Sequence, residues 1–117
     1  MAVFASRQIV MPVLTIAVTI TGTGDSSKCY AIINGTKQYS AGTHEVNAGD
    51  TITFGVSGYS VLTGFVKVDG TKVLEVTDPS AKTYDWAVPS GISTVEIAMA
   101  LSSTAGAYAG RITVTTA

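Results

Sequence analysis

The residues that could act as nucleophiles, proton donors or metal ligands are few. The chain has 117 residues, with one cysteine (Cys29), one histidine (His44) and eight acidic side chains. A structural zinc site usually needs four Cys or His ligands, which one such chain cannot supply, and a single cysteine excludes an internal disulfide. The sequence also lacks the Asp-x-Asp-x-Asp run that is typical of calcium loops. We therefore expect no metal site and no cofactor; a calcium site built from aspartates of separate loops stays an open alternative.

The two residues that could form a Cys–His pair have simpler structural interpretations. Cys29 lies in the apolar segment 28–33, which is typical of a β-strand, and there a cysteine behaves as a small buried hydrophobic residue. His44 lies between Gly42 and Val46 in a predicted loop, where we expect a solvated side chain. Serine and aspartate are common in the turns, but none lies in a nucleophile-elbow motif. We predict no catalytic residues and no enzymatic activity.

The glycine-containing loop 22–25 (GTGD) resembles a phosphate cradle only superficially. It is followed neither by the Lys-Ser/Thr pair nor by the helix on which such a loop depends. The sequence leaves open whether the chain forms an isopeptide bond of the kind known in surface β-sandwiches. It would join one of the lysines Lys28, Lys37 and Lys67 to Asn34 or Asn47.

Composition narrows the class of protein further. Seven basic and eight acidic side chains give a net charge of -1, and charged residues make up only 13% of the chain. Nucleic-acid-binding proteins usually carry a clustered basic face, so we expect no nucleic-acid partner. The apolar share of 46% is enough to bury a core, and the length fits one compact domain.

Alternation of apolar and polar residues dominates the chain and predicts β-strands throughout. The expected strands are 13–21, 28–33, 36–39, 51–57, 61–68, 71–77, 83–88, 93–101 and 111–116. We expect loops at 22–27 and 102–110. Two-residue hairpins are expected at Asn34-Gly35 and Asp69-Gly70, because Asn, Asp and Gly tolerate the positive φ of such turns. Many short strands at this spacing favour an antiparallel β-sandwich.

The only tryptophan lies in one of these strands. Alternation places Tyr84, Trp86 and Val88 on one face and Asp85 on the other. We predict that Trp86 anchors the core. The alternative is that Trp86 stacks on a sugar.

The N-terminal residues 1–12 are apolar and precede the strand pattern. Arg7 and the apolar run after it imitate a signal peptide, but Pro12 interrupts the run and no clear small-x-small site follows, so we expect no secretory processing. The run is also too short and too polar to insert into a membrane. We predict an arm at 1–12, followed by a domain at 13–117. The arm packs on its own domain or on a neighbouring subunit through apolar residues such as Phe4, Ile9 and Met11.

The surface is expected to make contacts. The mean hydropathy of +0.38 and the few charges suggest that part of the surface is covered by copies of the chain or by a partner. The aromatic residues Tyr59 and Tyr108 lie in predicted loops, where aromatic side chains suit contact with glycans or with another protein.

Several segments together resemble the small immunoglobulin-like modules in virion proteins of tailed phages and in bacterial surface proteins. The similarity spans about residues 28–116. The segments that carry it are YAIINGT (30–36), AGT (41–43), VNAGDTI (46–52), VKVDGT (66–71), YDW (84–86) and GRITVT (110–115).

The resemblance implies an immunoglobulin-like β-sandwich without enzymatic activity. It implies a decoration, head-fibre or tail protein of a phage virion, displayed in many copies. The partners would be the chain itself, as a homo-oligomer, or other virion proteins, and the location would be a virion or a cell surface. An adhesion module that binds surface glycans is the alternative. The family has no shared catalytic motif, so no functional residue is transferred.

Overall fold

The computed structural model describes residues 14–25, 27–57, 64–77, 80–100 and 108–117. Ten β-strands run through them: β1 (Thr15–Thr23), β2 (Cys29–Ile33), β3 (Thr36–Gln38), β4 (Ser40–Asn47), β5 (Thr51–Ser57), β6 (Gly64–Val68), β7 (Thr71–Val76), β8 (Ala81–Ala87), β9 (Thr94–Ala100) and β10 (Tyr108–Thr116). Among the described residues, no helix has the length and apolar character needed to cross a membrane.

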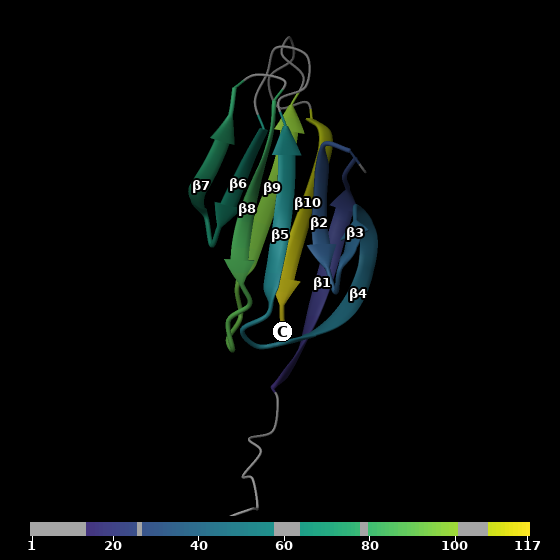
Figure 1. Ribbon diagram of the computed structural model, residues 1–117, viewed down its shortest axis with the longest axis vertical. Helices are drawn as coiled ribbons and strands as arrows, with labels where there is room; N and C mark the ends of the chain where they lie inside the picture. The colour runs from purple at the N-terminus through teal and green to yellow at the C-terminus, as the bar shows by residue number, and fades with distance from the viewer. Residues whose placement is uncertain (1–13, 26, 58–63, 78–79, 101–107) are drawn as a thin grey trace, which may run out of the picture.

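The strands form two antiparallel sheets (Figure 1). One sheet has six strands in the order β4-β1-β10-β9-β6-β7, and the other has four in the order β3-β2-β5-β8. The predicted all-β, antiparallel class is therefore confirmed. The first and last strands are neighbours, with Thr19 opposite Thr115, and the amide of Ala117 donates a hydrogen bond to the carbonyl of Ala17 at 3.0 Å.

The alternation along β1 explains how the six-stranded sheet acquires two unlike faces. Ile16, Val18 and Ile20 are buried against the other sheet, whereas Ala17 and Thr19 between them point to the outer face. β1 continues beyond its expected end to Thr23. It does so because Gly22 adopts a φ of 89°, which only glycine reaches easily, and the register with β4 shifts there.

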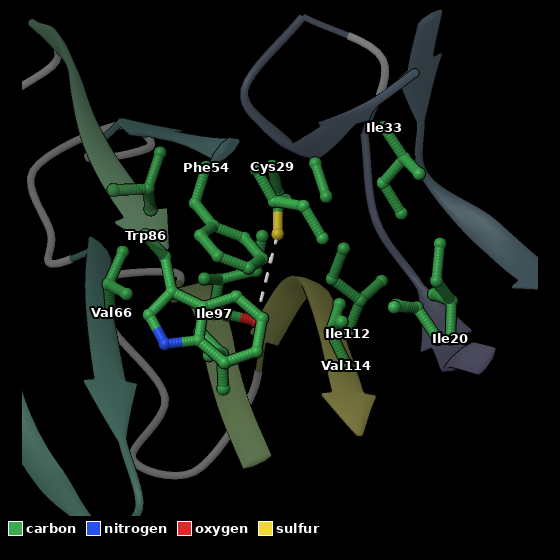
Figure 2. Packing of buried hydrophobic residues seen from close by; sticks show 14 of the residues in the cluster. Ile20, Cys29, Ile33, Phe54, Val66, Trp86, Ile97, Ile112 and Val114 are labelled. Atoms are coloured by element: carbon green, nitrogen blue, oxygen red, sulfur yellow. Dashed lines mark hydrogen bonds between the residues drawn. The ribbon is translucent and has the colours of Figure 1, made fainter. Parts of the chain in front are cut away.

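One hydrophobic core lies between the sheets (Figure 2). Phe54 is fully buried, and its ring lies 5.9 Å from that of Trp86, with a tilt of 50° between the planes. Trp86 is only 6% exposed, which confirms it as a core anchor and leaves no ring face for a sugar. Tyr84 and Val88 pack on the same side, while Asp85 points to solvent and accepts a hydrogen bond from the Thr53 hydroxyl at 2.8 Å.

Cys29 is part of this core, as expected. Its side chain is fully buried, and its Sγ donates a weak hydrogen bond to the carbonyl of Ile97 at 3.8 Å (Figure 2). Burial raises the pKa of the thiol to about 12, because the thiolate would lose its hydration. The thiol is therefore unreactive at neutral pH.

Both predicted hairpins are confirmed. The turn between β2 and β3 has φ values of 52° at Asn34 and 79° at Gly35, and the turn between β6 and β7 has 49° at Asp69 and 85° at Gly70. Positive φ at both central residues is the signature of the type I′ turn, whose twist matches that of the paired strands.

Two expectations about loops were wrong. His44 lies in strand β4, which was not predicted, because the small and polar residues of 40–47 hide the alternation and the pairing with β1 creates the strand. His44 is half-buried opposite Val18 and is not a solvated loop residue. The loop expected at 102–110 is also too long, since Tyr108 already pairs with Ala100; residues 102–107 lie outside the described residues.

Candidate functional site

The described residues offer a surface for contact and no enclosed site. Among the described residues no pocket is found, and no group of three or more of their His, Cys, Asp or Glu side chains could hold a metal ion. Of the predicted contact residues, Phe4, Ile9, Met11 and Tyr59 lie outside the described residues, as does the rest of the arm at 1–12. Tyr108 is the first residue of β10, opposite Ala100.

The most exposed large aliphatic side chains lie at one end of the two sheets. Ile92 is 82% exposed in the connection between β8 and β9, and Leu14 is 52% exposed at the start of β1. We call this region the pinned end. It comprises Leu14 and residues 47–50, 69–70, 88–94 and 116–117, and it is the lower end of the molecule in Figure 1, where the C-terminus lies.

Backbone hydrogen bonds join the start of β1 to both sheets at the pinned end. The amide of Ala48 donates to the carbonyl of Leu14 at 2.8 Å. The next amide, that of Gly49, donates to the carbonyl of Val88 at 2.8 Å, and the amide of Val88 donates to the carbonyl of Asp50 at the same distance. These bonds fix the turn between β4 and β5 against the end of β8, so Leu14 is exposed on an ordered support.

A second set of hydrogen bonds holds the connection that carries Ile92. The buried Thr116 hydroxyl donates to the carbonyl of Gly91 and accepts from the amide of Ser93, both at 2.8 Å. The Thr116 amide donates to the carbonyl of Ser93 at 3.0 Å. Ile92 is thus presented to solvent by a turn that is fixed on both sides.

Asp69 ties the β6–β7 hairpin to the same connection. Its carboxylate accepts hydrogen bonds from the amide of Thr94 and from the hydroxyl of Ser93, each at 2.8 Å. The Thr94 amide, and next the Ser93 hydroxyl, lower the pKa of Asp69 because they stabilise the charged form. Asn34, the equivalent residue in the other hairpin, makes a different tie: its Nδ2 donates to the carbonyl of Glu45 at 2.9 Å.

The Asp69→Asn variant is expected to flatten the acid limb of the stability profile. Asparagine tolerates the positive φ, as Asn34 does in the same type of turn, so the hairpin is retained. The lowered pKa means that the Asp69 carboxylate stabilises the fold above its ordinary pKa of 3.8, and that this contribution is lost as the pH falls through the lower, folded-state value. Urea unfolding from pH 7 to 2 should show the two proteins converging in acid. A constant difference would contradict this assignment.

The outer face of the four-stranded sheet carries an aromatic surface that the sequence analysis did not identify. Tyr30 lies opposite Gly55 in the register of β2 and β5, and a Cβ on Gly55 would overlap the Tyr30 ring. The ring therefore lies directly over the glycine backbone. The Lys37 ammonium lies 4.2 Å from the ring centroid. Only the strand register brings these residues together, so their spacing in the sequence gives no signal.

The outer face of the six-stranded sheet carries both threonine hydroxyls and paired charges. Thr19 lies opposite both Thr43 on β4 and Thr115 on β10, so hydroxyls lie side by side across these three strands. Glu96 of β9 pairs with Arg111 of β10, and Lys72 pairs with Glu75 on β7 at 2.7 Å. This face supplies no cluster of unpaired charge to which we can assign a ligand.

Comparison with known proteins finds no relative: no protein family, no curated protein and no solved structure matches the chain.

Proposed function

We propose that the chain is a non-enzymatic structural module that associates with copies of itself or docks on a larger particle. In this proposal the fold is immunoglobulin-like, the particle is a phage virion, and the contacts are made by the arm at 1–12 and by the pinned end. The observation that carries the proposal is the exposure of Ile92 on a hydrogen-bonded turn, at the same end of the molecule as Leu14.

Physical chemistry favours contact at this end. A large aliphatic side chain gains free energy when it is removed from water, at about 25 cal/mol per Å² of buried apolar area. Binding normally costs conformational entropy, but the turn around Ile92 is already fixed by Thr116, so little ordering remains to be done. Leu14 follows the apolar segment 1–13 directly, so that segment is attached to the domain through a residue of the pinned end.

Deleting residues 1–12 is expected to dissociate the assembly. Light scattering over a concentration series should give a fixed oligomer for the full chain and a monomer for the shortened one, because the arm contributes the largest apolar contact in this proposal. Circular dichroism should report the same strand content for both. An oligomer of unchanged mass after the deletion would contradict a role for the arm. A monomer in both forms would contradict assembly and would favour the carbohydrate-binding alternative.

The contribution of the pinned end is separable from that of the arm. The Ile92→Ser variant removes the exposed aliphatic group and should weaken association without lowering stability, since the side chain is 82% exposed. Val73→Ser is the matched control, because Val73 is also exposed but lies on β7, away from the pinned end. If both variants self-associated as strongly as the wild type, Ile92 would be excluded from the contact.

A further inference from the structure

The four edge strands of the two sheets differ in how well their backbones could pair with an added strand. The edges are β4 and β7 in one sheet and β3 and β8 in the other. An edge strand presents alternate backbone N–H and C=O groups outward, and these can pair with another extended segment. Sheets in soluble proteins usually block such edges with short strands, bulges, charges or side-chain plugs.

Side-chain hydrogen bonds occupy outward backbone groups along the β4 edge. The Ala48–Leu14 hydrogen bond and the register with β1 direct the even-numbered residues of β4 toward β1 and the odd-numbered ones outward. The outward carbonyl of Glu45 accepts a hydrogen bond from Asn34 Nδ2 at 2.9 Å. The outward amide of Asn47 donates to the Asp50 carboxylate at 2.9 Å. An added strand would have to break both bonds.

Two further edges are poor templates for other reasons. β3 has three residues, Thr36–Gln38, which is too short for a stable ladder. β7 pairs with β6 through a register shift between Val66 and Lys67, and its Lys72 and Glu75 side chains form an ion pair. Bulges and charges of this kind are recognised means of preventing edge pairing.

The β8 edge is longer and more regular. All seven residues, Ala81–Ala87, pair with β5 without a register shift. The Val88–Asp50 hydrogen bond continues this register and directs the even-numbered residues toward β5. The backbone groups of Ala81, Thr83, Asp85 and Ala87 therefore point outward, and β5 is the only described strand that pairs with β8. β8 carries two charged side chains: Lys82, which is on the core side of the sheet but exposed, and Asp85, which is exposed on the outer face.

We propose that the β8 edge of one copy receives residues 1–13 of a second copy as an added strand. This inference rests on the proposed self-association and gives it a docking site. Main-chain hydrogen bonds would supply affinity, as in other cases of strand addition. A seven-residue strand spans about 23 Å, and the segment offers eleven residues before Pro12.

The position of β1 favours a second copy as the donor. β1, which follows the segment, lies beside β4 at one end of the six-stranded sheet, whereas β8 packs near β7 at the other end. The segment of one copy thus starts on the side away from its own β8. The segment also carries a single charged side chain, the basic Arg7, and β8 presents the acidic Asp85 on its outer face.

The Thr83→Pro variant tests the docking site. The Thr83 amide points away from β5, so proline there leaves the existing ladder intact while it removes an outward donor and adds a ring that blocks pairing. We expect self-association to become roughly tenfold weaker or more. Thr43→Pro is the matched control, because it makes the same change at an outward amide of β4 and should leave association unchanged. Thermal unfolding of both variants checks that the domain is intact.

Cross-linking gives a second, independent measurement. Copies carrying Thr83→Cys are mixed with copies carrying Ala5→Cys or Ile9→Cys, two positions that share a strand face with Arg7, and oxidised; the native Cys29 is fully buried and does not compete. A mixed disulfide dimer is expected with Thr83→Cys and not with Thr43→Cys. An oligomer that survives Thr83→Pro, or that cross-links through Thr43→Cys, would overturn the β8 site while leaving self-association standing. A wild type that stays monomeric at all concentrations would overturn both.

Discussion

Replacing Phe54 by alanine is expected to lower the free energy of unfolding by about 3–5 kcal/mol, the cost of deleting a large aromatic side chain from a packed core. Phe54 is fully buried between the sheets, and its ring packs against Trp86. A domain of this size is stabilised by about 5–15 kcal/mol in total, so the loss is a large share of that total and the variant should unfold at a clearly lower urea concentration. Urea denaturation followed by Trp86 fluorescence measures the difference directly.

Val73→Ala is the control for this experiment. Val73 is 37% exposed on the edge strand β7, and a substitution at such a surface position should change stability by about 0.5 kcal/mol or less. If Phe54→Ala cost as little as Val73→Ala, the core could not be centred on the Phe54–Trp86 pair.

The second large effect is expected at Gly22. Gly22 has a φ of 89°, and a Cβ added to it would overlap the carbonyl oxygen of Arg111 in the neighbouring strand β10. Because the obstacle is backbone within a paired ladder, neither strand can move away without breaking hydrogen bonds. We expect Gly22→Ala to cost about 2–5 kcal/mol, the sum of about 1–2 kcal/mol of left-handed strain and about 1–3 kcal/mol of steric overlap.

Gly35→Ala separates the two contributions. Gly35 has a similar φ of 79°, but a Cβ there meets no atom within 4 Å. Its substitution should therefore cost only the conformational strain, about 1–2 kcal/mol. Thermal unfolding of the two variants side by side is the measurement. Equal losses would show that β10 does not approach Gly22 as closely as described.

The features that follow from local patterns could be predicted from the sequence. The alternation from Leu14 to Ile20 defines a strand with one buried face, and the Asn-Gly and Asp-Gly pairs define two turns whose φ values are positive as expected. Trp86 was placed in the core by the same alternation. Each of these features depends on residues that are near one another in the chain.

The features that depend on long-range pairing could not be predicted. Strand β4 has little apolar alternation of its own and exists because β1 pairs with it. Tyr30 and Gly55 meet only through the register of β2 and β5. Ile92 had a weak local signal, since an isoleucine inside the turn sequence Pro-Ser-Gly-Ile-Ser has no strand to bury it, but Thr116, which fixes that turn, is distant in the sequence.

The pairing of the first and last strands has a mechanical consequence. β1 starts and β10 ends at the pinned end, so the two attachments of the described domain, Leu14 and Ala117, lie at the same end of the sheets. Hydrogen bonds between antiparallel strands lie perpendicular to the strands. A pull that separates the two attachments would therefore open the β1–β10 ladder one bond at a time, beginning at Ala117 and Ala17. A force applied at only one of the two attachments does not pull the β1–β10 ladder apart. The domain therefore resists force best when it is held through one attachment.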